Sequence, residues 1–146
     1  MQIKEPKNIF RRIAQLRKLK KKSVVVGFPK GYNPYPDGTP VALVATVHEF
    51  GSATVPPRPY FRTTLQRNNF YKSLRKMTFK KVIRGELSES IAMHQLGDTI
   101  ANDIKDEIVA VNSPALAQET IKRKGSTNPL VDTGHLKQSV TYKVVK

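Results

Sequence analysis

The longest regular pattern in this chain of 146 residues is an apolar repeat between Ser88 and Asn112. In that segment apolar side chains recur every three or four residues, which is the spacing of an amphipathic helix that buries one face. The repeating positions are Met93, Leu96, Ile100, Ile104, Ile108 and Val111. A helix of this length needs other elements to cover its apolar face, so the pattern predicts that it anchors the core.

Shorter patterns on either side predict a sheet and more helices. Residues 8–22 place apolar side chains at a near-helical spacing among basic ones, which predicts a basic amphipathic helix. The β-branched run Ser23–Phe28 predicts a short buried strand, and the alternation in Ser139–Val145 predicts a C-terminal strand. We therefore expect an α+β fold in which a small mixed or antiparallel sheet packs with several helices. A single domain over residues 23–146 would follow a basic N-terminal helix or arm over residues 1–22.

Proline and glycine divide the middle of the chain. Four prolines between residues 29 and 40 predict an exposed loop, and Thr39 and Pro40 resemble an N-cap and a first helical residue. Gly51 stands where a left-handed C-terminal cap belongs, so a helix is predicted over residues 40–50. Its expected core face carries Leu43, Val47 and Phe50.

The prolines at 56, 57 and 59 predict a stiff loop or edge strand over residues 51–59. A helix should follow over residues 61–84, with a weak point at Asn68 and Asn69. Its inward side chains are expected to be Leu65, Phe70, Leu74 and Met77.

A short helix and a brief turn are predicted near the C-terminus. Ser113 and Pro114 repeat the N-cap signature and Gly125 closes the helix, whereas Asp132 is expected to cap a brief turn through Leu136.

The net charge of +15 favours an anionic partner, which can be nucleic acid, anionic lipid or an acidic protein. Basic residues crowd the N-terminus, and a second basic block runs from Arg58 to Arg84, with no acidic residue between Gly51 and Gly85. The basic block lacks interleaved aromatic residues for base stacking, so any contact with DNA should be independent of sequence. The cations expected on the helix of this block are Lys72, Arg75, Lys76, Lys80 and Lys81.

Several classes of function have no support in the sequence. The chain has no cysteine, no apolar run that could cross a membrane and no apolar segment of a secretory signal. His48-Glu49 lacks the second histidine of a zinc protease motif, because Ser52 stands in that place, and His94 and His135 lie in other predicted elements. Phosphate-binding loops and nucleophile elbows are missing as well. We expect no enzyme, no metal and no cofactor.

Three motifs together resemble the tail-completion, or neck, family of tailed bacteriophages. The first is Pro36-Asp37-Gly38-Thr39 before the helix that ends in His48-Glu49-Phe50-Gly51, followed by Val55-Pro56-Pro57-Arg58-Pro59-Tyr60-Phe61-Arg62. The second is Ala115 to Arg123, and the third is Pro129-Leu130-Val131-Asp132-Thr133-Gly134-His135-Leu136 before Ser139-Val140-Thr141-Tyr142. The resemblance covers most of the chain from Val24 onward but does not include the lysine-rich N-terminal helix.

The resemblance implies a virion protein of the neck or tail, assembled in the host cytoplasm, that completes or terminates the tail and joins it to the head. The protein would form a ring of identical subunits, a hexamer matched to the tail tube, between a connector or stopper protein and the tail-tube protein. No membrane contact is implied. The motifs leave open whether the role is that of a tail completion, tail terminator, neck or minor tail protein. The alternative is a sequence-independent DNA-binding protein of phage or prophage origin, which charge alone supports.

Physically, the motifs predict a scaffold and an interface. The scaffold positions are His48, Glu49, Phe50, Gly51, Pro56, Pro57, Pro59, Asp132, Thr133 and Gly134, and Gly134 should adopt a backbone conformation that other residues resist. An exposed arm carrying Arg58, Tyr60, Phe61 and Arg62 is expected to grip an adjacent subunit. The basic face of the helix over residues 61–84 should meet either an acidic partner protein or the DNA that passes through the channel of the ring. We expect the partner protein, because a tight grip on DNA would impede ejection of the DNA.

Overall fold

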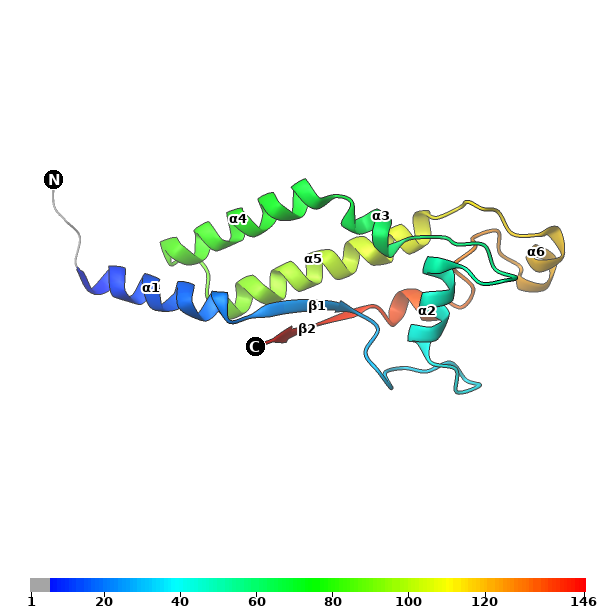
Figure 1. Ribbon diagram of the computed structural model, residues 1–146, viewed down its shortest axis with the longest axis horizontal. Coiled ribbons are helices and arrows are strands. Elements are labelled where there is room, and N and C mark those ends of the chain that lie inside the picture. Colours follow the sequence, from blue (N-terminus) through cyan, green and yellow to red (C-terminus); the bar gives the residue numbers. More distant parts are fainter. Residues whose placement is uncertain (1–5) are drawn as a thin grey trace. The chain divides into compact units, whose positions relative to one another are not determined.

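The computed structural model describes residues 6–146, with side chains from residue 9 onward (Figure 1). The predicted segment 1–22 therefore lies partly outside the described residues. Within the described range, strands β1 (Ser23–Gly27) and β2 (Thr141–Val145) pair in a two-stranded antiparallel sheet. The helices are α1 Pro6–Lys20, α2 Val41–Phe50, α3 Phe61–Leu65, α4 Asn68–Arg84, α5 Glu89–Ala110, α6 Gln118–Lys124 and α7 His135–Gln138. The α+β class and the helical nature of the basic N-terminal segment are confirmed.

Contacts divide the chain into two compact units, and each unit is assembled from segments that are distant in sequence. The first unit comprises residues 1–25, 68–99 and 142–146, and the second comprises residues 26–67 and 100–141. Helix α5 contributes residues 89–99 to the first unit and residues 100–110 to the second. The predicted boundary at residue 22 stays a prediction.

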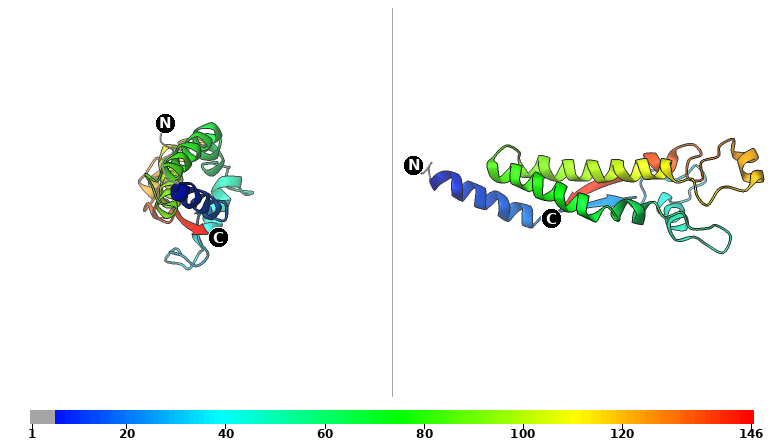
Figure 2. Two further views of the ribbon diagram at one scale, coloured as in Figure 1. Left: turned by 90° about the vertical axis from the view of Figure 1, so that its left-hand side faces the viewer. Right: turned by 90° about the horizontal axis from the view of Figure 1, so that it is seen from above.

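The first unit has a compact apolar core formed by α1, α4 and the beginning of α5. Helix α1 packs against α4, and Figures 1 and 2 show α4 beside the part of α5 that belongs to this unit. Burial of these side chains is the main term that stabilises the unit. The buried residues of this core are Leu19, Val82, Ala92, Met93 and Leu96, with Leu16, Val24, Leu74, Phe79, Leu87 and Val144 packed around them.

A close approach between Gly97 and Tyr142 joins α5 to β2 within the first unit. A Cβ atom at Gly97 would overlap the Tyr142 ring. A hydrogen bond of 3.0 Å joins the Tyr142 hydroxyl to Nδ1 of His94, one turn earlier on α5. Only glycine leaves room for the ring at this position, so the pairing of strand and helix depends on it.

The second unit buries apolar side chains from α2, α5 and the C-terminal segments. Those fully or nearly buried are Val41, Ala45, Tyr60, Ala101, Ile104, Ile108, Leu130, Leu136 and Val140. Ile104 and Ile108 belong to the repeat that predicted α5, and the expected role of that helix in the core is confirmed in both units.

Several predicted helix ends differ from the structure. Pro40, not Thr39, is the N-cap of α2, and the Thr39 amide donates to the Asp37 carboxylate at 2.9 Å instead. Gly51 has a positive φ of 80° but an extended ψ of 176°, so the predicted left-handed cap is wrong in ψ. The predicted helix over 61–84 divides into α3 and α4 just before Asn68, at the expected weak point.

The predicted starts of the last two helices also differ from the structure. Helix α6 begins at Gln118 rather than at Pro114, because the carbonyls of Pro114 and Ala115 accept hydrogen bonds from Arg58 instead of helical amides. Gly134, not Asp132, is the N-cap of α7, and its left-handed conformation (φ 79°, ψ 3°) confirms the expected role of this glycine.

Two predicted burial patterns are wrong. Strand β1 is partly exposed, with Val25 at its centre open to solvent. Leu43 and Phe50 on the expected core face of α2 are 56% and 66% exposed. Helix α2 turns Val41, Ala45 and Glu49 inward instead, because the Glu49 carboxylate must reach the amides that begin α3.

The expected inward face of the next two helices is also mostly exposed. Phe70 and Met77 are each 52% exposed, and Leu65 is exposed as well. Helix α4 instead turns Leu74, Thr78 and Val82, spaced every four residues, toward the interior. Of the predicted inward residues, only Leu74 packs on the core.

Candidate functional site

The first motif forms a clasp between the end of α2 and the beginning of α3, in which Glu49 is the central group. Its carboxylate is only 5% exposed and accepts hydrogen bonds from the backbone amides of Phe61 at 2.9 Å and Arg62 at 3.0 Å. The Arg62 side chain donates to the same carboxylate at 3.0 Å and to the Glu49 carbonyl at 2.9 Å. Because the first amides of a helix have no partners within it, Glu49 acts as a distant cap for α3.

Gly51 and the prolines after it return the chain toward α2. A Cβ atom at Gly51 would lie 3.0 Å from both the Val55 carbonyl and the Pro57 ring, at a φ that side chains resist. The Ser52 hydroxyl accepts from the Val55 amide at 3.1 Å, which closes a tight turn. The Arg58 amide then donates to the His48 carbonyl at 2.6 Å.

Arg58 and Tyr60 are buried, so the expectation that they stand on an exposed arm is wrong. Arg58 is 4% exposed, and its guanidinium donates to the Pro114 carbonyl at 2.8 Å and to the Ala115 carbonyl at 3.5 Å. Burial lowers the pKa of Arg58 from its ordinary value. Burial also raises the pKa of Tyr60, whose hydroxyl has no hydrogen-bond partner among the described residues. Both side chains hold the chain together from within.

The third motif anchors the proline-rich loop over residues 29–40. The His135 ring donates through Nε2 to the Asn33 carbonyl at 2.7 Å and lies 4.5 Å from the Tyr35 ring, centroid to centroid. The side-chain carboxamide of Asn33 donates to the Ser139 hydroxyl at 3.0 Å, and that hydroxyl donates to the His135 carbonyl at 2.8 Å. Asp132 and Thr133 stay exposed beside this network.

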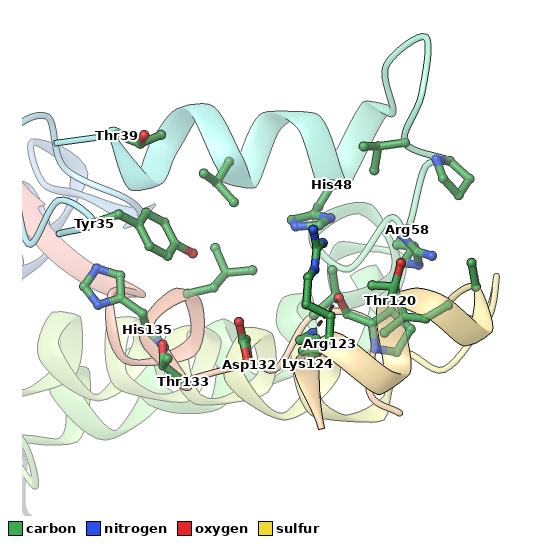
Figure 3. Close-up of a pocket in the computed structure, with 18 of the residues that line it drawn as sticks. Tyr35, Thr39, His48, Arg58, Thr120, Arg123, Lys124, Asp132, Thr133 and His135 are labelled. Atoms are coloured by element: carbon green, nitrogen blue, oxygen red, sulfur yellow. Dashed lines mark hydrogen bonds between the residues drawn. The ribbon is translucent and has the colours of Figure 1, made fainter. Parts of the chain in front are cut away.

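The two motifs border one pocket of about 990 Å³ in the second unit. Figure 3 shows the side chains of Tyr35, His48, Arg123 and Asp132 turned toward this space. Nδ1 of His48 is enclosed without a hydrogen-bond partner in the described structure. Burial, with the positive charges of Arg58 and of Lys124, lowers the pKa of His48.

A smaller, more apolar groove of about 380 Å³ is lined in part by Glu49 and Arg62 of the clasp. Its lining includes Phe28, Phe50, Phe61 and Leu65, and the Arg62 guanidinium lies 5.2 Å from the centre of the Phe50 ring. Phe50 and Leu65 are exposed, and Leu43 lies two turns before Phe50 on the same side of α2. We call Leu43, Phe50 and Leu65 the apolar stripe.

The predicted cations of α4 are all exposed and belong to the first unit. They are Lys72, Arg75, Lys76, Lys80 and Lys81. The first unit has 17 lysines and arginines against 4 acidic residues, a net charge of +13. The second unit has 9 against 7, a net charge of +2. These cations thus belong to a different unit from the clasp, although the sequence describes one basic block from Arg58 to Arg84.

Sequence reasoning missed the groups that complete the site. Asn33 and Tyr35 lie in the segment 29–40, for which the sequence predicts only an exposed loop. Lys124 directly precedes Gly125, which closes a predicted helix, and in the structure it donates to the carbonyls of Asn128 and Pro129. Their partners are distant in sequence, so no local signal reveals them. The Asn-Pro pair at 128–129 is a turn signal, and the Asn128 carboxamide does accept from the amides of residues 130 and 131.

Among residues 6–146, no helix is long and apolar enough to cross a membrane, and no group of three acidic or histidine side chains is placed to hold a metal ion. Comparison with protein-family models, with curated proteins and with solved structures finds no match for this chain.

Proposed function

We propose that this chain is a structural virion protein of a tailed bacteriophage that completes or terminates the tail and joins it to the head connector as one subunit of a ring. The motifs that resemble the tail-completion family motivate the proposal. One structural observation carries it: Leu43 and Phe50 on α2 have the helical spacing of a buried face, yet the single chain leaves both of them and Leu65 on α3 exposed.

An exposed apolar stripe is costly unless another surface covers it. Clustered apolar side chains on a soluble chain are typical of contacts between proteins, which have an apolar centre and a polar rim. Around Phe50 and Leu65 the rim is supplied by Arg62, which is exposed at the edge of the groove. The stripe therefore fits a contact between subunits.

The charge of each unit supports a second copy as the partner of this stripe. The second unit carries a net charge of only +2, so two such units approach without strong repulsion. In a ring, each subunit contacts the next through two different patches. The apolar stripe would be one of these two patches.

The clasp explains how the stripe keeps its position. Phe50 lies between Glu49, which caps α3, and Gly51, which starts the return of the chain. Leu65 ends the helix that Glu49 caps. Glu49 and Gly51 thus act as a scaffold for the stripe, and the Glu49 carboxylate is occupied by contacts within the chain.

A second candidate function is sequence-independent DNA binding. The exposed cations of α4, in a block without acidic residues between 51 and 85, favour it. Such a protein would hold phosphates through charge alone and would lose affinity steeply as salt rises.

Deletion of the gene in the phage that carries it tests the proposal. We expect DNA-filled heads and finished tails that remain separate, and joined particles when the wild-type gene is supplied from a plasmid. The Leu43→Gln variant should fail to restore joining. Ile91→Gln is the matched control, because Ile91 is also an exposed apolar residue on a helix but lies in the first unit. Gln suits a helix, and both sites are exposed, so both variants should fold.

Two results would contradict the proposal. Joined, infectious particles from the deletion strain would remove the structural role. Particles that join but lose or fail to keep their DNA would favour the DNA-binding candidate.

A further inference from the structure

The first unit carries most of the charge of the chain on two adjacent helices. Helix α1 packs against α4, and both expose cations along their length. On α1 these include Arg11, Arg12, Arg17 and Lys18. Among the described cations of these two helices, Arg84 has an ion pair, a long one of 3.8 Å to the exposed Glu86. This surface therefore has a strong positive field that the unit itself does not neutralise.

Apolar side chains are interleaved with these cations. Phe10 on α1 is 72% exposed, and Ile9 and Ile13 are exposed beside it. On α4, the exposed Met77 shares a face with Lys80 and Lys81, which follow it by three and four residues. Exposed apolar side chains that gather among unpaired cations form a surface that another protein can cover. We call the exposed basic and apolar side chains of α1 and α4 the mixed face.

We propose that the mixed face docks an acidic partner protein that offers apolar side chains among its carboxylates. The inference rests on the proposed function, because it names the chemistry of the neighbour to which the ring is joined. A central apolar contact with surrounding charge pairs is the usual composition of such an interface, and opposite charge speeds and orients docking.

The same observations disfavour two other occupants. A second copy of the chain would present its own +13 unit to this one, and like charges placed together oppose association. Nucleic acid would use the cations to contact phosphates, but the phosphate backbone offers nothing to cover Phe10 or Met77. An acidic, partly apolar protein surface satisfies both kinds of group.

Two variants separate the charged part of the mixed face from the apolar part. The first replaces Lys72, Lys76 and Lys80 together by Gln, and the second replaces Phe70 and Met77 by Gln. A matched control replaces Lys105, Lys122 and Lys137, three lysines of the second unit, by Gln. The gene for each variant is supplied to the deletion strain from a plasmid, and joining of heads to tails is measured in extracts at low and high salt. Far-UV circular dichroism and the urea midpoint verify that each variant is folded.

We expect the triple lysine variant to lower joining by about tenfold at low salt, because several exposed charge pairs together contribute about that factor. Its difference from wild type should shrink as salt rises, since salt screens the same pairs in the wild type. The Phe70 and Met77 variant should lower joining at both salt concentrations, and the control should join normally. DNA retention in the particles that do join should equal that of wild type.

Other outcomes overturn the inference. If the apolar variant joins like wild type while the lysine variant yields joined particles that leak DNA, the face holds nucleic acid. If both variants join and retain DNA normally, the face is only solvated. The deletion strain with and without the wild-type gene tests the proposed function separately, so a failure of the proposed function is distinguishable from either of these results.

Discussion

Replacing Glu49 by Ala should destabilise the second unit far more than replacing its ion-pair partner Arg62 by Ala. Glu49 accepts two backbone amides and one side-chain donor with a carboxylate that is almost fully buried. The Arg62 side chain is 57% exposed. The two variants remove the same salt bridge, but only Glu49→Ala leaves the first amides of α3 without an acceptor.

The expected magnitudes follow from these contacts. Each buried amide that loses its acceptor costs about 1 to 3 kcal/mol, so two amides make the loss for Glu49→Ala about 3 kcal/mol or more. For Arg62→Ala, an ion pair whose cation is mostly exposed contributes about 0.5 kcal/mol and the contact with the Phe50 ring about the same, which makes the loss about 1 kcal/mol. Glu49→Gln keeps one acceptor oxygen and should fall between the two.

Urea unfolding at neutral pH, followed by far-UV circular dichroism, measures these free energies. The urea midpoint should fall most for Glu49→Ala, less for Glu49→Gln and least for Arg62→Ala. Equal losses for Glu49→Ala and Arg62→Ala would refute the reasoning, because they would place the stabilisation in the salt bridge and not in the capping of α3.

Two further predictions concern single positions in the same unit. Gly51→Ala should lower the free energy of unfolding in urea by about 3 kcal/mol, because the new Cβ meets the Val55 carbonyl at an unfavourable φ. Gly38 has a similar φ with open space around it, so Gly38→Ala should lower the same free energy by about 1 kcal/mol. Equal losses would contradict the role of crowding at Gly51. Because the pKa of His48 is lowered in the folded chain, the unfolded chain takes up this proton first as pH falls, so stability should decrease from about pH 6.5 downward. His48→Gln should flatten that part of the pH profile of the unfolding free energy, and an unchanged profile would contradict the assignment.

Elements with strong local signals could be predicted from the sequence. The repeat over residues 88–112 predicted α5 within two residues at each end, and the β-branched and alternating runs predicted two strands of one small sheet, whose pairing with each other the structure shows. The asparagine pair at 68–69 marked the division between α3 and α4. These features depend on propensity and spacing, which a single sequence contains.

Features that depend on partners distant in sequence could not be predicted. Arg58 binds the carbonyls of residues 114 and 115, which buries its side chain within the chain, and α6 begins only at Gln118. Nothing local identifies Glu49 as the cap of α3 or places the Tyr142 ring against Gly97. The motifs around Glu49 and Gly134 could be recognised, but the clasp and pocket that they build required the fold.

The exposed faces of α2 and α4 are a different kind of error. Leu43 and Phe50 have the spacing of buried residues, and the prediction assumed that the chain itself would bury them. Periodicity states that a face is suited to burial, but it does not state which surface covers that face. We propose that another subunit covers the apolar stripe.

The most direct test of this claim uses the absence of cysteine from the sequence, which makes a single introduced cysteine unique in the chain. Leu43→Cys, labelled with a photoactivatable benzophenone, should cross-link one copy of the chain to another in assembled particles, and mass spectrometry of the cross-linked peptides should place the contact within the second unit of the neighbouring copy. The same label at Ile91→Cys should give no such cross-link between copies. Absence of cross-links from Leu43→Cys between copies in joined particles, or equal cross-linking from both positions, would contradict the assignment of the apolar stripe to the ring interface.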